Sequence, residues 1–248
     1  MAVAIAKQLP GTAVQLVWTR EDDLAGGYYR PQFHHRIVAH LGADGLPVAW
    51  EHTTVGQPLV KGTPLEAMMV NPKTGIESTL VEGLDPMPYA VPAVHLQAHQ
   101  TSAKVPAHWW RSVGSTHTGF ALECAIDECA RAAGQDPVAY RLALLKDSPK
   151  EKRALEMAAA KAGWGTPLPP GEGRGIAVCA SFGSIVAEVA HVSVSADGKL
   201  RVLDVYAAVD CGDVVNPDSA TAQVEGGVIF GLSAAMVGEI DQSMGRLR

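Results

Sequence analysis

The chain has 248 residues, of which 47% are hydrophobic and 19% are charged, and its formal net charge is −6. This length is enough to bury the core of one large domain or of two small ones. The acidic balance, without any basic cluster, argues against nucleic acid and anionic membrane surfaces as partners. No apolar run is long enough to span a bilayer, and none has the flanks of a signal peptide.

The N-terminal region predicts a helix end followed by a β-hairpin. Residues 2–9 are typical of a helix end, residues 13–18 of a strand, and Thr19 of the N-cap of a short acidic turn. Two β-prone runs, 32–41 and 46–55, flank a Gly-Ala-Asp-Gly turn and indicate a hairpin. These strands carry four histidines, which are His34, His35, His40 and His52. Because neighbouring strand residues face opposite sides, we interpret them as ordinary strand residues rather than metal ligands.

The middle of the chain predicts a long loop, a strand and then a helix. Residues 56–88 are rich in Gly, Pro, Asn and Thr, which is typical of a binding loop, and residues 91–101 predict a strand. After Gly114, apolar residues recur with helical spacing. We expect Phe120 and Cys124 on the apolar stripe of this helix and Glu123 on its polar face.

Two further helices are predicted from their end signals. Gly134 ends the previous helix, while Asp136 and Pro137 are typical of an N-cap and a first helical position. Ser148 is expected to cap a third helix, which Gly163 ends.

The four cysteines form no C-x-x-C pair. Cys124 and Cys129 are five positions apart, which does not place them on one helix face. This spacing argues against an iron–sulfur or zinc site built from cysteines. We interpret all four, including Cys179 and Cys211, as small buried hydrophobic residues of a reducing compartment.

The C-terminal third predicts three strands and a glycine-containing helix. The strand-like runs are 175–182, 185–195 and 199–212, and an Ala-Asp-Gly-Lys turn joins the last two. A helix is expected from Asn216, and it contains Gly226, Gly227 and Gly231. Each glycine costs a helix about 1 kcal/mol relative to alanine. Another helix or a ligand is therefore expected close to this backbone.

The stretch 108–115, "HWWRSVGS", combines two tryptophans and an arginine with small residues, as expected either of a packed surface loop or of a backbone close to a ligand. Four stretches resemble the molybdenum-binding large subunit of the xanthine dehydrogenase/aldehyde oxidase family. They are "QLVWTREDD", "WWRSVGSTHTGFALECAIDE", "AAGQDPVAYRLALL" and "VDCGDVVNPDSATAQVEGGVIFGLSAA". The motifs follow the family's order from Val14 to Glu239. Within the family they are similar to isoquinoline 1-oxidoreductase beta subunits and to bacterial aldehyde dehydrogenase large subunits.

The resemblance implies an α+β fold of mixed sheets and helices. Residues 1–164 would form part of a first molybdenum cofactor-binding region, and residues 165–248 part of a second. Family members are much longer, with one cofactor loop upstream and the catalytic glutamate downstream of the matched segment. We therefore expect an internal fragment, and Glu239 does not lie in the family's catalytic-loop context.

The resemblance also implies a cofactor site. The cofactor would be molybdopterin with molybdenum, in the cytosine dinucleotide form common in bacteria, and its sulfurs rather than protein side chains would hold the metal. Arg111 matches the family's active-site arginine, whose fixed cation can polarise substrate or stabilise a developing oxyanion. Ser112, Val113 and Gly114 match the loop beside the metal. Ser112 and Val113 differ from the residues of xanthine-oxidising members, which disfavours purines as substrates.

Further matches lie on the C-terminal helix and in the tryptophan pair. Gln223 matches the glutamine whose amide contacts the cofactor, and Gly226 and Gly227 would let the helix approach the pterin. Trp109 and Trp110 either form a lid over a flat substrate or pack as core residues.

The activity implied is oxidation of aldehydes or N-heteroaromatic compounds, with oxygen derived from water. The implied partners are a small-molecule substrate, a small [2Fe–2S] iron–sulfur subunit and, as a candidate electron acceptor, a cytochrome c. The expected location is the bacterial cytoplasm or periplasm. The alternative is a catalytically inactive, truncated cofactor-binding or interaction fragment.

Overall fold

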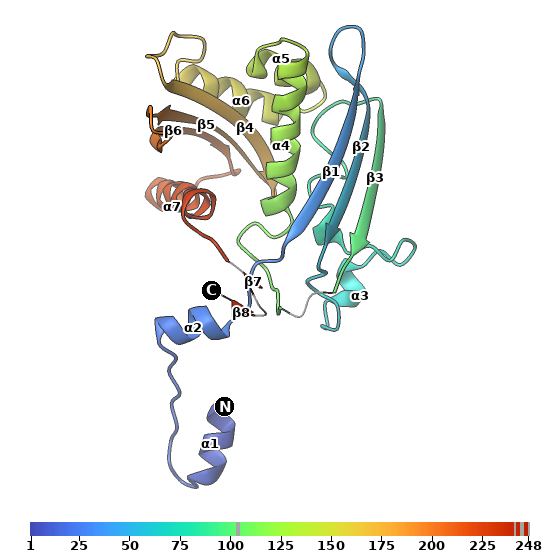
Figure 1. Cartoon of the computed structure of the whole chain (residues 1–248). Helices are drawn as coiled ribbons and strands as arrows, with labels where there is room; N and C mark the ends of the chain where they lie inside the picture. The colour runs from blue at the N-terminus through green and yellow to red at the C-terminus, as the bar shows by residue number, and fades with distance from the viewer. Residues whose placement is uncertain (103–104, 241, 244–245, 248) are drawn as a thin grey trace.

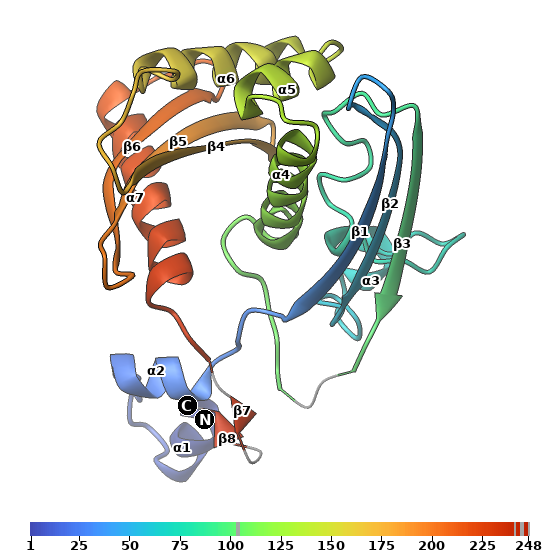
Figure 2. The ribbon, with the colours of Figure 1, turned by 45° about the horizontal axis from the view of Figure 1, so that its top comes forward.

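The computed structural model describes residues 1–102, 105–240, 242–243 and 246–247. Within these residues the chain has two three-stranded sheets and a short two-stranded one, together with helices, so the α+β class is confirmed. Helix α4 (Ser115–Ala132) lies between the two larger sheets in both views (Figures 1 and 2). Within the described part of the chain, no helix is both long and apolar enough to cross a membrane.

An N-terminal arm lies away from both larger sheets (Figure 2). It contains α1 (Ala2–Gln8) and α2 (Arg20–Gly26), and Thr19 caps α2 through a reciprocal capping box with Asp22, which confirms the predicted N-cap. The strand predicted at residues 13–18 is wrong, because this segment pairs with no strand among the described residues. A β-prone run becomes a strand only where a neighbour satisfies its backbone hydrogen bonds.

The first sheet contains the predicted hairpin, β1 (Phe33–Leu41) and β2 (Pro47–Gly56), in antiparallel register. Strand β3 (Ala93–Gln100) joins β2 in parallel, so the sheet is mixed. The long connection between β2 and β3 contains the short helices α3 (Glu66–Met69) and η1 (Ser78–Leu80). It is packed around Glu77, a fully buried carboxylate that accepts hydrogen bonds from the backbone nitrogens of Leu59 and Val60 at 2.9 and 3.0 Å.

The predicted helix ends agree with the structure, with one exception. Helix α5 (Pro137–Leu144) is capped by Asp136, whose side chain accepts from two backbone nitrogens. Ser148 precedes α6 (Pro149–Lys161) but makes no side-chain cap within the described chain. Its hydroxyl instead donates to the carbonyl of Pro88 at 2.7 Å, so a tertiary acceptor replaces the local one.

The second sheet is an antiparallel meander of β4 (Glu172–Ser181), β5 (Ser184–Val194) and β6 (Leu200–Asp210). Helix α6 packs across it, and residues such as Ile176, Val178, Ala187 and Val189 are buried there. Helix α7 (Pro217–Met236) has Asn216 as its N-cap, in agreement with the predicted start, and none of its residues, all of them described, is buried. The chain ends with the short pair β7 (Gln242–Ser243) and β8 (Arg246–Leu247).

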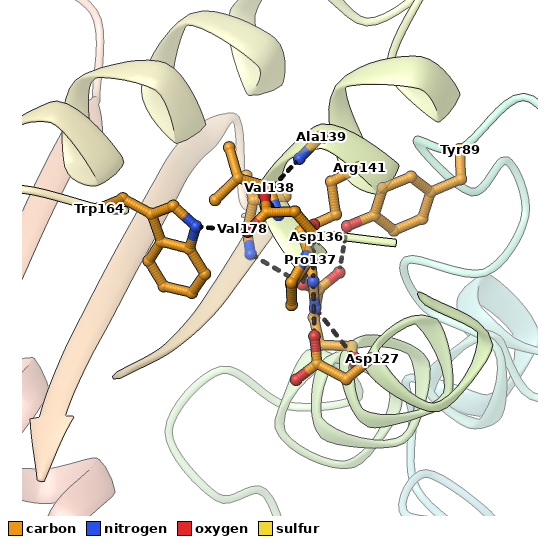
Figure 3. A network of polar contacts seen from close by, with 10 residues as sticks. Tyr89, Asp127, Asp136, Pro137, Val138, Ala139, Arg141, Trp164 and Val178 are labelled. Carbon is orange, nitrogen blue, oxygen red and sulfur yellow. Dashed lines mark hydrogen bonds and ion pairs between the residues drawn. The ribbon is translucent and has the colours of Figure 1, made fainter. Parts of the chain in front are cut away.

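The face of α4 that enters the core differs from the predicted one. Glu123, expected on the polar face, is only 6% exposed, whereas Phe120, expected in the apolar stripe, is 73% exposed. Glu123 is buried because it has partners there: it accepts from Arg141 Nε at 2.9 Å, from Tyr89 Oη at 2.6 Å and from the Val178 backbone nitrogen at 3.0 Å (Figure 3). Burial raises the pKa of Glu123, and the positive charge of Arg141 opposes that rise.

The expectation that all cysteines are buried is also wrong. All four lie in the described ranges and are free thiols; Cys129 is buried and Cys179 half-buried, while Cys124 and Cys211 are exposed. Helical spacing places Cys124 beside Phe120, and both lie on the outer face of α4.

Candidate functional site

The loop before α4 meets the first half of α7. Arg111 and Gln223 are 112 positions apart in sequence, yet Arg111 Nη2 lies 3.4 Å from both the backbone oxygen and the side-chain Oε1 of Gln223. These hydrogen bonds are long and therefore weak. The guanidinium Nε and Nη1 make no hydrogen bond within the described part of the chain. Arg111 and Gln223, which were predicted to share one site, thus lie together, and the Nε and Nη1 groups of Arg111 remain available as hydrogen-bond donors.

The backbone of this loop adopts an unusual conformation. Ser112 and Val113 have φ of +75° and +49°, in the left-handed region that costs a non-glycine residue about 1–3 kcal/mol. Neighbouring groups maintain it: the Thr116 hydroxyl donates to the Arg111 carbonyl at 2.6 Å, and the Gly114 nitrogen donates to Glu82 Oε2 at 2.7 Å. Such strain is common at ligand-binding loops, where the surrounding structure holds it in place.

The three predicted site glycines have different surroundings. A Cβ on Gly114 would lie 2.4 Å from the carbonyl oxygen of Thr79, so this glycine is required by packing inside the protein. A Cβ on Gly227 would lie 3.7 Å from Arg111 Nη2, whereas one on Gly226 would meet nothing within 4 Å. Gly227 therefore faces the arginine, and Gly226 faces open space.

The two tryptophans also differ. The Trp110 ring is 4.8 Å from the ring of Phe230 on α7, and the guanidinium of Arg30 lies 5.5 Å from its centroid. Trp109 contacts the ring of His108 and is 41% exposed. Trp110 thus takes part in packing around Arg111, whereas Trp109 leaves a large flat surface accessible.

A partly buried chain of three histidines lies behind the loop, and the sequence analysis of the strands did not predict it. His117, in the first turn of α4, places Nε2 2.9 Å from the Thr79 carbonyl and Nδ1 3.0 Å from His35 Nε2. His35 Nδ1 is in turn 2.8 Å from His52 Nε2. Strand alternation correctly turned His35 away from His34, but it could not show that a helix residue would meet His35.

The direction of these hydrogen bonds follows from one end. A carbonyl oxygen can only accept, so His117 donates from Nε2, and because burial lowers the pKa of this ring and keeps it neutral near pH 7, its Nδ1 accepts. The same argument then makes His35 and His52 donors at Nε2. Burial lowers the pKa of each ring from 6.5 to about 4, so all three are neutral near pH 7, and the hydrogen bonds give them the same tautomer. The chain ties β1, β2 and the η1 segment to the first turn of α4.

A separate cleft of about 540 Å³ lies between the 83–90 segment, α4 and β4. It is lined in part by Tyr89, Gly119 and Cys179, and burial raises the pKa of the Cys179 thiol to about 11. It includes none of the predicted site residues. Among the described residues, no group of three or more His, Cys, Asp or Glu side chains is arranged to hold a metal ion.

The groups around Arg111 fit a large, polar, anionic cofactor. Arg111 offers free guanidinium donors, Gln223 is exposed and offers an amide, and the open space beside Gly226 gives access to the backbone of α7.

Comparison with known proteins shows the family of the chain. Two family models, both described as a molybdopterin cofactor-binding domain, match residues 1–144 and 74–248. The beta subunit of the isoquinoline 1-oxidoreductase of Brevundimonas diminuta is 29% identical, over 96% of this chain and 31% of its own length. The membrane-bound aldehyde dehydrogenase (pyrroloquinoline-quinone) of Gluconacetobacter polyoxogenes is 30% identical, over 95% of this chain and 33% of its own length.

The B subunit of the nicotinate dehydrogenase of Pseudomonas putida is 31% identical, over 81% of this chain and 18% of its own length. The chain thus spans about a third of the length of the first two relatives. The family models, by contrast, together cover it from end to end. The chain belongs to the molybdopterin cofactor-binding domain family.

Proposed function

We propose that this chain is the part of a molybdenum hydroxylase that holds the cofactor, and that the enzyme oxidises aldehydes or N-heteroaromatic compounds with oxygen derived from water. The observation that carries the proposal is the meeting of Arg111 and Gln223 beside a strained loop, in a chain of the molybdopterin-binding family. When bound, the molybdenum cofactor supplies two-electron redox chemistry, and the protein supplies position and electrostatics.

The two residues have different roles in this proposal. Arg111 directs its free donors toward substrate and stabilises negative charge that develops on a substrate oxygen or nitrogen. Gln223 uses its amide as both donor and acceptor toward the pterin. The backbone of Ser112 and Val113 and the open side of Gly226 allow close approach of the cofactor.

The names of the relatives and the exposure of Trp109 support this substrate class. Two relatives carry N-heteroaromatic compounds in their names and one carries an aldehyde. The exposed Trp109 ring offers a stacking surface for a flat substrate. For the cofactor we propose molybdopterin with molybdenum, in its cytosine dinucleotide form. The name of one relative carries a different cofactor, pyrroloquinoline quinone.

The remaining assignments concern the whole enzyme. Two relatives are named as subunits, which supports a multi-subunit enzyme. We propose a small [2Fe–2S] subunit as its partner and a cytochrome c as a candidate electron acceptor. The boundary between two cofactor-binding regions at residues 164 and 165 stays a prediction, as does the bacterial cytoplasmic or periplasmic location.

A second candidate is a cofactor-binding fragment without turnover. It is favoured by α7, none of whose described residues is buried, because a helix of this composition is normally covered.

Metal analysis and dye reduction separate the two candidates. The chain is produced in a bacterium that makes the molybdenum cofactor, and molybdenum per chain is measured by mass spectrometry. Stoichiometric molybdenum with dye reduction by an aldehyde or by isoquinoline supports the hydroxylase, and molybdenum without dye reduction supports the second candidate. A folded chain without molybdenum contradicts both.

A further inference from the structure

We propose that Phe230 is a positioning residue: its ring, packed on Trp110, holds α7 so that Gln223 stays against Arg111. The consequence for catalysis rests on the proposed function, whereas the consequence for the structure does not. The aromatic cluster consists of Trp110 and Phe230, with Arg30 and Arg111 against their faces.

The spacing of residues on α7 is the first observation. Gln223, Gly227 and Phe230 are separated by four and then three positions, so they lie on one face of the helix. All three are directed at the same loop. Gln223 meets Arg111 Nη2 through two oxygens, Gly227 lies beside the same nitrogen, and the Phe230 ring lies 5.7 Å from the guanidinium carbon.

The second observation is that no described residue of this helix is fully buried, although one of its faces, which includes Val224, Val228 and Leu232, is half-buried. Ile229, the neighbour of Phe230, is 65% exposed. Phe230 itself is half-buried, because its ring packs on Trp110 with centroids 4.8 Å apart. The two hydrogen bonds from Arg111 to Gln223 are each 3.4 Å long and are too weak to orient a 20-residue helix.

The third observation is that the cluster joins three distant segments. Arg30 precedes β1, Trp110 and Arg111 belong to the loop before α4, and Phe230 lies on α7. Each ring has a guanidinium within 6 Å of its centroid, which is the geometry of a cation–π contact. Removing the Phe230 ring takes away the packing partner of Trp110 and one neighbour of Arg111 at the same time.

The structural test needs no cofactor. Three variants of the chain are compared with wild type: Phe230→Leu removes the ring but keeps an apolar side chain, Phe230→Tyr keeps the ring, and Ile229→Ala is the matched control. Amide hydrogen exchange is followed in peptides from residues 217–236 and 108–116. We expect Phe230→Leu to speed exchange in both segments on the order of tenfold, because both lose the contact that joins them. Phe230→Tyr recovers most of the protection, and Ile229→Ala exchanges like wild type.

The kinetic test uses the protein loaded with molybdenum. Phe230→Leu is expected to lower kcat per bound molybdenum several-fold with little change in KM, since Gln223 and Arg111 lose their relative position. A merely structural role would lower the molybdenum content and leave kcat per molybdenum unchanged.

The exchange test and the kinetic test can contradict different parts of the proposal. Wild-type exchange in both segments of Phe230→Leu overturns the positioning role. Faster exchange in a chain that takes up no molybdenum supports the positioning role and contradicts the proposed function. Unchanged kcat per molybdenum in Phe230→Leu, in spite of faster exchange, overturns the catalytic consequence.

Discussion

Two arginines, Arg141 and Arg111, lie in opposite surroundings. Arg141 is fully buried, and its guanidinium donates to Glu123, to Asp127 at 2.6 Å and to two backbone carbonyls (Figure 3). Arg111 is exposed, and among the described residues its guanidinium donates only to two neutral oxygens, each at 3.4 Å. The guanidinium of Arg141 uses four of its five N–H groups and stabilises the fold, whereas the guanidinium of Arg111 has free donors that are available to a ligand. The predictions below test this difference.

The largest effect is expected from removing the buried cation. Arg141→Ala leaves the Glu123 carboxylate buried without its charge partner, which costs about 3–5 kcal/mol of folding free energy. Chemical denaturation measures this. Lys150→Ala is the matched control, because its pair with Asp210 is exposed and contributes about 1 kcal/mol or less. Similar losses in both variants would show that the buried cluster does not hold the fold.

Arg111→Ala is expected to lower turnover without lowering stability, the opposite of Arg141→Ala. Stability and molybdenum content are expected to stay near wild type, while turnover of the loaded protein falls by about 10²-fold, since one preorganised electrostatic contact is lost. Thermal unfolding, mass spectrometry and dye reduction are measured on the same preparation. A stability loss as large as that of Arg141→Ala would remove the distinction between the two arginines.

Gln223→Ala is expected to act on the cofactor rather than on the substrate. It removes a hydrogen-bonding amide worth roughly 1–3 kcal/mol, so molybdenum content or turnover should fall through a displaced cofactor. Gln223→Glu provides a useful comparison, because it keeps the shape and adds a negative charge beside Arg111. Full molybdenum and full activity in Gln223→Ala would place the site elsewhere.

The histidine chain predicts how folding depends on pH. Between pH 6.5 and about 4 the unfolded chain binds protons that the folded chain, with its depressed pKa values, does not. The free energy of unfolding is therefore greatest above pH 6.5 and decreases as the pH falls toward 4. His117→Gln removes one of these groups and should flatten the pH dependence, measured by denaturation at pH 7 and 4.5. Equal slopes in wild type and variant would count against the neutral chain.

The smallest effect is expected at Gly226. Its Cβ position is open, so Gly226→Ala should stabilise α7 in the cofactor-free chain by about 0.5–1 kcal/mol. If the cofactor approaches this backbone, the same variant should take up less molybdenum. A gain in stability with unchanged molybdenum would mean that the glycine serves no ligand.

Predictions that depended on neighbours in sequence agree with the structure. The caps at Thr19 and Asp136 and the hairpin turn before β2 were predicted correctly, because their hydrogen bonds join residues only a few positions apart. The burial of Glu123, the acceptor of Ser148 and the unpaired segment 13–18 were not, since each depends on a partner supplied, or not supplied, by a distant segment.

In the candidate site, too, features that depend on sequence neighbours were predicted, whereas contacts between distant segments were not. Its residues could be named from the sequence, because the motifs around Arg111 and Gln223 are local patterns that resemble a family. Their contact, the part that Phe230 takes in it and the histidine chain behind the loop could not, because they join residues from separate elements.

By itself, the sequence determined the caps of α2 and α5 and the hairpin turn before β2, and through its motifs it indicated the α+β class and the family, because these depend on short-range hydrogen bonds and recurring motifs. Only the tertiary structure decided which arginine is buried and which is free. Charge and residue type are the same at both positions, and the difference lies in the carboxylates that the fold brings to Arg141 but not to Arg111.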